Sequence, residues 1–296
     1  MLALMNHHYD IHFDRLELFR DGGSTAYTLF SGATKYFLRA IKPAFFDAAI
    51  NAVDIQVFLQ KQGLPVPPVL PSKNGMPYVR TDGGLLILYD FINGAESVPA
   101  NDAEAAGALV GQLHRAMRDY PGTLLQKDKH FYVGRYIDLL RKKQYKKADA
   151  FAEYGDALWE KVKDLPRSYC HGDMHPGNML KTPEGKLYLL DFDTSCSGFP
   201  MYDIALFCNQ TNYFKYNKRG HEKSRVMLHR FLPAYEKHHA VSAREINAFY
   251  DLIALSHFAL QATIIELYGI NCVDDKFFDQ QLDWLRRWCE QCETMR

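Results

Sequence analysis

Three side chains of this sequence have the types and spacing that chemistry needs: Asp173, Asn178 and Asp191. Asp173 and Asn178 lie five positions apart in the segment 169–180, whose glycines and proline oppose a regular helix. Asp191 follows the apolar run 187–190, which predicts a buried strand. A loop and a strand end therefore carry two carboxylates and one amide.

The short segment 181–186 contains the proline and glycine of a tight turn. A turn here would form a hairpin and return Asp191 to the neighbourhood of Asn178. An amide oxygen and a carboxylate that converge in this way suit a hard cation such as Mg²⁺. A separate carboxylate, Asp173, suits a base that orients a hydroxyl nucleophile. This division of work is typical of phosphoryl transfer, in which positioning and charge neutralisation supply most of the catalysis.

These residues carry a resemblance to kinases. His171-Gly172-Asp173 with Asn178 resembles the H-x-D-x-x-x-x-N catalytic loop, and Asp191-Phe192-Asp193 resembles the D-F-G metal motif with Asp in place of Gly. The form H-G-D-x-H-x-x-N resembles the aminoglycoside phosphotransferase and choline kinase superfamily of small-molecule kinases. The resemblance implies ATP and Mg²⁺ as cofactors. It also implies that Asp173 and His171 are catalytic, with His171 ordering the loop, and that Asn178 and Asp191 bind the metal.

The same stretch has a second interpretation, as a metallohydrolase. His171, Asp173 and His175 occupy alternate positions, as metal ligands on a strand do. Sites of that kind need further ligands, and Pro176 with Gly177 breaks any continued strand, so the coordination would be incomplete. The sequence favours the kinase interpretation.

The N-terminal part predicts three strands, at 16–20, 26–30 and 35–40. The turn Gly22-Gly23-Ser24 lies between the first two and is predicted to bind nucleotide, because glycine lets backbone N–H groups approach phosphate oxygens closely. The turn does not match G-x-G-x-x-G, and by itself it is more typical of a plain hairpin turn; the later motifs favour the nucleotide interpretation.

A basic residue, Arg39, ends the third predicted strand, where the resemblance places the phosphate-contacting base. Lys35 is the alternative, but it lies at the start of that strand. Residues 44–62 have apolar positions at helical spacing, and kinases use an acid of this helix to hold the base. Asp54 is the candidate, although the superfamily usually has Glu; a capping or solvated acid is the other interpretation.

Two further strands are predicted at 76–80 and 85–90, followed by a link between lobes. The resemblance implies that backbone groups from Asp90 to Ile92 meet the adenine edge of the nucleotide. Helical periodicity then dominates, and His114, which lies between apolar neighbours, is predicted to be a packed core histidine rather than a ligand. Capping boxes are predicted at Asn101 with Glu104 and at Ser242 with Glu245, and an acidic pair at 274–275 is predicted to cap the last helix.

The resemblance and the element pattern together predict an α+β, bilobal protein-kinase-like fold. Its small N-terminal lobe would hold an antiparallel sheet with one helix and bind nucleotide, over residues 1–93. A larger, mainly helical C-terminal lobe, residues 94–296, would carry the catalytic loop and the substrate site.

The charge balance and the cysteine content limit the classes of partner and the cellular location that the sequence allows. Lys plus Arg equals Asp plus Glu, at 35 each, which argues against nucleic acid or an anionic membrane as a partner. No transmembrane stretch or signal peptide is expected. Six scattered cysteines are typical of reduced thiols and predict a cytoplasmic protein. A zinc site at Cys289 and Cys292 would need a second pair of ligands, which the sequence lacks.

The leading hypothesis is an ATP- and Mg²⁺-dependent phosphotransferase that acts on the hydroxyl of a small molecule. An aminoglycoside, an amino alcohol, homoserine and a sugar or nucleoside stay open as acceptors, as does GTP in place of ATP. A cationic amine would suit a pocket of C-terminal acids and aromatics. These residues are Tyr213, Phe214, Tyr216, Glu266, Tyr268, Asp274, Asp275 and Asp279.

Two alternatives have other functions. One is a nucleotide-binding scaffold or spore-coat-associated kinase-like protein without turnover; the retained Asp173, Asn178 and Asp191 argue against it. The other is a protein Ser/Thr kinase. Only twelve positions separate Asp191 from Asp203, and no A-P-E follows, so a long activation loop has no room.

Overall fold

The computed structural model describes residues 1–22 and 24–294 and has an α+β fold. The chain forms two compact units. The first comprises Met1–Ser97, Asp119–Gly122 and Pro176–Thr194; the second comprises Val98–Arg118, Thr123–His175 and the chain from Ser195 onward. The division predicted at residue 93 lies close to the first crossing, at Ser97. The first unit also takes in Pro176–Thr194, because strands of that segment pair with a strand just before Ser97.

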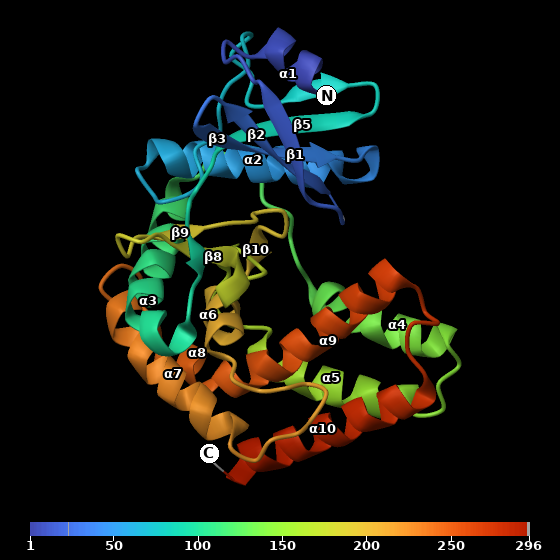
Figure 1. The fold of residues 1–296 in the computed structure, drawn as a ribbon. Coiled ribbons are helices and arrows are strands. Elements are labelled where there is room, and N and C mark those ends of the chain that lie inside the picture. Colours follow the sequence, from blue (N-terminus) through green and yellow to red (C-terminus); the bar gives the residue numbers. More distant parts are fainter. Residues whose placement is uncertain (23, 295–296) are drawn as a thin grey trace. The chain divides into compact units, whose positions relative to one another are not determined.

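The first unit contains a five-stranded antiparallel sheet in the order β1-β2-β3-β5-β4 (Figure 1). Its strands are β1 (Arg15–Arg20), β2 (Thr25–Ser31), β3 (Thr34–Ile41), β4 (Val79–Thr81) and β5 (Gly84–Asp90). These ranges confirm the five strands predicted from the sequence to within a few residues.

Each face of this sheet is covered by one helix. Alternate residues of β5 point to opposite faces, as the pleat requires. Leu88 packs with Met5 and Tyr9 from α1 (Leu2–His8) and the turn after it, whereas Ile87 packs with Val53 from α2 (Phe46–Lys61). All of these side chains are buried. Burial of each large apolar side chain stabilises the unit by about 1.5–3 kcal/mol and holds the sheet between the two helices.

A second, three-stranded sheet belongs to the same unit. It has the order β6-β8-β9, with β6 (Ala95–Glu96), β8 (Met179–Lys181) and β9 (Leu187–Leu189) all antiparallel. β8 and β9 form the hairpin predicted from the turn residues. The N–H of Leu190 donates to the carbonyl of Asn178 at 2.9 Å, which brings the residue before Asp191 against Asn178.

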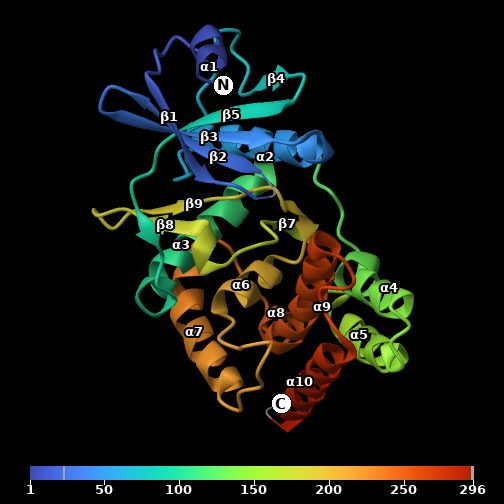
Figure 2. The same cartoon turned by 45° about the vertical axis from the view of Figure 1, so that its right-hand side comes forward.

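The second unit is mainly helical (Figure 2). Its helices are α3 (Pro99–Ala116), α4 (Arg135–Lys142), α5 (Ala148–Val162), α6 (Pro200–Cys208), α7 (Gly220–Tyr235), α8 (Ala243–Asn247), α9 (Phe249–Tyr268) and α10 (Asp275–Thr294). A single π-helical turn, His130–Gly134, leads into α4, and a two-stranded ribbon pairs β7 (Ser168–Cys170) with β10 (Cys196–Gly198). Among the described residues, no helix has the length and apolar character needed to cross a membrane.

Helices α3 and α7 lie side by side in both views (Figures 1 and 2). Two glycines of α3 allow this close approach. A Cβ atom on Gly107 would lie 2.2 Å from the carbonyl oxygen of Phe231, and one on Gly111 would lie 2.6 Å from that of Tyr235. Both distances are shorter than a carbon–oxygen contact permits, so only glycine fits at these positions without a shift of the helices.

Two of the predicted helix caps are confirmed and one is wrong. The capping box of Ser242 with Glu245 and the cap by Asp274 are confirmed; the N–H of Phe277 donates to the Asp274 carboxylate at 2.9 Å. The box predicted at Asn101 is wrong. Helix α3 begins two residues earlier, at Pro99, and the N–H of Val98 donates to the carboxylate of Asp102 at 2.8 Å. Proline is well suited to the first turn, so Asn101 is already inside the helix.

Candidate active site

The loop after β7 presents Asp173. Gly172 has φ 83°, a left-handed conformation that disfavours other residues, and the N–H of His175 donates to the Asp173 carbonyl at 3.0 Å. The Asp173 side chain is 48% exposed, and one of its oxygens lies 3.5 Å from Nε2 of His175. His171 is fully buried. Of the two catalytic candidates in this loop, His171 is therefore buried and Asp173 is exposed to solvent.

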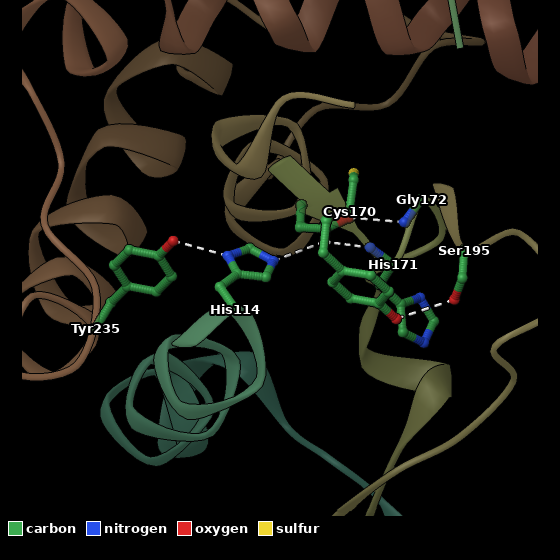
Figure 3. A network of polar contacts seen from close by, with 8 residues as sticks. His114, Cys170, His171, Gly172, Ser195 and Tyr235 are labelled. Carbon is green, nitrogen blue, oxygen red and sulfur yellow. Dashed lines mark hydrogen bonds and ion pairs between the residues drawn. The ribbon is translucent and has the colours of Figure 1, made fainter. Parts of the chain in front are cut away.

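Asp203, in the first turn of α6, holds the backbone of this loop, whose residues Cys170, His171 and Gly172 are labelled in Figure 3. It is fully buried. Oδ2 accepts from the N–H of His171 at 2.6 Å, and Oδ1 accepts from the N–H of Gly172 at 2.8 Å and the thiol of Cys170 at 3.1 Å. His114 Nε2 lies 3.0 Å from Oδ2. Each oxygen therefore faces two hydrogen-bond donors, which is the full capacity of an ionised carboxylate.

The electrostatics of Asp203 agree with ionisation. Burial alone raises its pKa, but the hydrogen bond from His114, the nearby histidine rings and the Gly172 amide outweigh burial and hold the pKa below the usual range. A buried charge of this kind is tolerated only because donors surround it. The catalytic loop is therefore fastened to a fixed negative charge.

The two metal-binding candidates lie in the first unit, on the β8–β9 hairpin. Asn178 ends a short 3₁₀ turn, Pro176–Asn178, and is 8% exposed. Asp191 lies two residues beyond β9 and has φ 57°, a conformation that costs energy in a residue with a side chain. Such strain concentrates at functional sites.

An amide oxygen and one carboxylate fit the donor preference of Mg²⁺, which in nucleotide sites takes one or two protein oxygens and completes its shell with water and phosphates. Among the described residues, no group of three or more His, Cys, Asp or Glu side chains could hold a metal. The described residues therefore form no closed zinc site, and this includes His171, Asp173 and His175.

Arg39 lies in β3 and makes a forked ion pair with Asp193. Its two terminal nitrogens donate to the two carboxylate oxygens at 3.2 and 2.6 Å. Burial lowers the pKa of Arg39, but the hydrogen bond and charge of Asp193, with those of Tyr89 and Asp191, raise it well above its usual value. The guanidinium is thus a permanent positive charge beside the residues at the end of β9.

The partner predicted for Arg39 was Asp54, and the structure does not form that pair. Asp54 is on the exposed side of α2. Gln56, two residues on and 4% exposed, points inward instead and accepts from the Tyr89 hydroxyl at 3.2 Å. Two residues along a helix turn the side chain by about 200°, so these two positions face opposite ways. Any contact of Asp54 with nucleotide stays a prediction.

The remaining nucleotide candidates lie where the sequence placed them. Gly22 and Ser24 flank the β1–β2 turn, and Gly23 lies outside the described residues. Asp90 ends β5, its N–H donates to the carbonyl of Pro68 at 3.0 Å, and burial raises the pKa of its carboxyl group. Ile92 follows in an irregular segment. Their contacts with nucleotide stay predictions.

Comparison with known proteins identifies the family. The model of the APH phosphotransferase enzyme family matches residues 16–254, a range that contains Arg39, Asp173, Asn178 and Asp191. The chain belongs to this family. It is a phosphotransferase that acts on an alcohol group of a small molecule. The resemblance given by the loop residues is thereby confirmed.

Relatives in sequence include an uncharacterised protein of Deinococcus radiodurans, 26% identical over 98% of this chain and 90% of the relative. A homoserine kinase of Rhizobium meliloti is 23% identical over 73% of this chain and 70% of the relative. A homoserine kinase of Pseudomonas aeruginosa is 29% identical over about half of each chain, 53% and 52%.

Similar solved structures include an amicoumacin kinase in complex with AMP-PNP, Ca²⁺ and Ami. It has a TM-score of 0.74 and 16% identity, and the match covers 97% of this chain and 90% of that chain. A microcompartment-associated aminopropanol kinase has a TM-score of 0.69, 17% identity and coverage of 98% and 95%. At these identities the likeness shows the fold alone: the protein-kinase-like α+β fold predicted from the sequence.

Proposed function

We propose that this chain transfers the γ-phosphate of ATP to a hydroxyl group of a small molecule, with Mg²⁺ as the metal. The observation that carries the proposal is the loop 171–175, which exposes the Asp173 carboxylate while Asp203 holds the loop backbone from the inside. A carboxylate fixed by its backbone and open to solvent is what a base for an incoming hydroxyl requires.

Each candidate has one role in this proposal. Asp173 accepts a hydrogen bond from the acceptor hydroxyl, orients its oxygen for attack and takes up its proton late in the transfer. His171, buried behind it, orders the loop. Arg39 contacts phosphate oxygens through its guanidinium. Asn178 and Asp191 would hold Mg²⁺, which when bound neutralises charge on the β- and γ-phosphates.

The nucleotide assignment draws on the neighbours. The amicoumacin kinase structure holds AMP-PNP, and a spectinomycin phosphotransferase structure, 14% identical with a TM-score of 0.69 over 98% of this chain and 96% of that chain, holds ADP. For this chain we propose ATP, bound by the turn around Gly22 and Ser24 and by backbone groups from Asp90 to Ile92. A cytoplasmic location would supply that ATP.

For the acceptor we propose an amino alcohol or a hydroxylated amino acid. Several of the relatives in sequence are homoserine kinases, and one structural neighbour is an aminopropanol kinase. Three of the four acids predicted to attract a cation already have partners. Glu266 pairs with Arg135 at 2.6 Å, Asp279 pairs with Lys147 at 2.7 Å, and Asp274 caps α10. These three acids are therefore weaker candidates for the recognition of an amine.

The protein-kinase alternative has little room in the structure. The chain after Asp193 enters β10 at Cys196, and Pro200 begins α6. In this segment Thr194 is exposed, whereas residues 195–199 pair with β7 or are buried, so it is too short to serve as a long phosphorylated loop.

The test is Mg²⁺-ATP turnover, followed as ADP release against a panel of amino alcohols, hydroxylated amino acids, aminoglycosides and sugars. Asp191→Ala is run beside the wild type, with Asp149→Asn, an 88% exposed acid of α5, as the matched control. Acceptor-dependent release that is lost in Asp191→Ala and kept in Asp149→Asn supports the proposal. Full transfer by Asp191→Ala would overturn the metal assignment. Nucleotide binding without release for any acceptor would favour the scaffold alternative.

A further inference from the structure

A buried chain of polar contacts joins Asp203 to His114 and Tyr235, and Figure 3 shows the contact between the last two. Nε2 of His114, on α3, lies 3.0 Å from Oδ2 of Asp203, and Nδ1 of the same ring lies 2.7 Å from the hydroxyl of Tyr235, on α7. All three side chains are fully buried. The sequence indicated a packed core histidine at 114; the structure shows a buried histidine with a polar partner on each ring nitrogen.

The contacts determine where the ring proton lies. The ionised carboxylate of Asp203 can accept hydrogen bonds but cannot donate one. Nε2 of His114 therefore carries the hydrogen that faces it. Nδ1 then accepts from the hydroxyl of Tyr235. In this arrangement every polar atom of the chain has a partner, which is the condition under which a buried polar network stabilises one fixed geometry.

We propose that His114 and Tyr235 are positioning residues of phosphoryl transfer, which act by holding the Asp203 carboxylate, and through it the catalytic loop that carries Asp173. The inference rests on the proposed function for its catalytic consequence. The three other donors to Asp203 belong to residues 170–172 and move with the loop. His114 ties the carboxylate to a helix outside that loop.

The helix packing makes this arrangement specific. Tyr235 reaches His114 because Gly107 and Gly111 let α7 approach α3 closely. A Cβ atom on Gly111 would lie only 2.6 Å from the carbonyl oxygen of Tyr235, so a larger residue there would push α7 away. The glycines thus fix the distance between the two helices on which the ring and the hydroxyl are mounted.

Three variants separate the contacts. Gln at position 114 places an amide N–H near the position of Nε2, so His114→Gln keeps the donor to Asp203 and loses the link to Tyr235. His114→Leu loses both contacts. Tyr235→Phe removes only the hydroxyl and keeps the ring.

The matched controls come from the same unit. His221→Gln replaces a fully buried histidine that stacks on Trp288. Tyr136→Phe removes a buried hydroxyl that has no hydrogen-bond partner within residues 1–22 and 24–294. These controls report the effect of losing a buried histidine or hydroxyl away from the loop.

Two measurements are made on each variant. Steady-state kinetics give kcat and the KM for ATP. The amide proton shifts of His171 and Gly172, followed by NMR between pH 5 and 8, report their hydrogen bonds to Asp203 without turnover. If the loop is held as proposed, His114→Leu lowers kcat about 10- to 100-fold at unchanged KM, the scale of an ångström-sized misplacement. Its two amide shifts move and become pH-dependent, because Asp203 then protonates more readily. His114→Gln restores most of both signals, and Tyr235→Phe falls between.

The proposal is overturned if the two amide shifts in His114→Leu match the wild type, or if kcat falls equally in His114→Leu and His221→Gln. The NMR arm keeps this test separate from the proposed function. Shifts that move as expected in a protein without kinase turnover would retain the anchoring of the loop and reject the reaction. Should His114→Leu fail to fold, Tyr235→Phe against Tyr136→Phe decides the question by the same two readouts.

Discussion

Replacing Asp193 by Asn should both destabilise the first unit and weaken its nucleotide binding. Arg39 donates two hydrogen bonds to the Asp193 carboxylate. Asn keeps one acceptor oxygen, loses the negative charge and turns an N–H₂ group toward the guanidinium. The guanidinium then stays partly buried beside Asp191, with its forked partner gone.

The magnitude follows from the burial of the pair. The side chains of Arg39 and Asp193 are 16% and 32% exposed. Exposed pairs contribute up to about 1 kcal/mol, and breaking a fully buried pair costs about 3–5 kcal/mol. The intermediate burial places the loss for Asp193→Asn at about 2 kcal/mol in the free energy of unfolding. A loosened Arg39 should raise the KM for ATP about tenfold, which corresponds to about 1.4 kcal/mol.

The assay is a double-mutant cycle. Arg39→Lys, Asp193→Asn and the double variant are compared by urea unfolding and by the KM for ATP. Because Lys cannot reproduce the fork, the two single changes should remove the same interaction, with a coupling energy of about 1.5–2 kcal/mol. Glu17→Gln is the matched control, since it breaks the Arg15–Glu17 pair of β1, whose side chains are 56% and 52% exposed. Its effect should stay below about 0.5 kcal/mol.

The predicted coupling of Arg39 with Asp193 would be contradicted by additive effects in the cycle. It would also be contradicted by an Asp193→Asn protein indistinguishable from Glu17→Gln in both stability and KM. Either result would mean that the fork neither holds Arg39 in place nor compensates its burial.

Further outcomes are expected for three other residues. Asp203→Asn should lose about 3–5 kcal/mol of unfolding free energy at pH 7, because an amide N–H₂ would face hydrogen-bond donors; a loss under about 1 kcal/mol in urea unfolding would contradict the buried charge. Since the pKa of Asp203 is depressed in the folded state, its contribution to stability should persist above about pH 3.9 and be lost as the pH falls below it. Burial lowers the pKa of His257 to about 4, so the protein should lose stability as the pH falls from about 6.5 toward 4, and His257→Phe should flatten that slope in thermal unfolding; an unchanged slope would argue against a neutral buried ring. Ser242→Ala should remove the cap of α8 at about 1 kcal/mol and leave turnover unchanged, and a loss of activity at full stability would assign Ser242 a different role.

The local features of the site could be predicted from the sequence. The turn between β8 and β9 contains Pro183 and Gly185, and it returns the chain as expected, so that Leu190 bonds to Asn178. The glycine before Asp173 has the left-handed backbone that the loop needs. These features depend on neighbouring residues or on short hairpins, where residue type and spacing nearly determine geometry.

The contacts between distant segments could not be predicted in the same way. Arg39 pairs with Asp193, 154 positions away, and the sequence offered Asp54 as an equally charged partner. Whether Asp54 could reach Arg39 depends on which side of α2 faces the sheet. Asp54 and Gln56 lie on opposite sides of this helix, about half a turn apart. His114 appeared as a core residue because its apolar neighbours signal burial. The polar partners that it finds, Asp203 and Tyr235, lie on other helices.

The most direct test of the central claim is the turnover of Asp173→Asn with Mg²⁺-ATP and the best acceptor of the panel, beside the wild type and Asp149→Asn. Asp173→Asn should bind ATP normally in a thermal-shift titration and transfer phosphate at least about 100-fold more slowly, because it lacks the positioned base. Asp149→Asn should behave as the wild type. Transfer by Asp173→Asn at the wild-type rate would contradict the claim that Asp173 orients and deprotonates the acceptor hydroxyl.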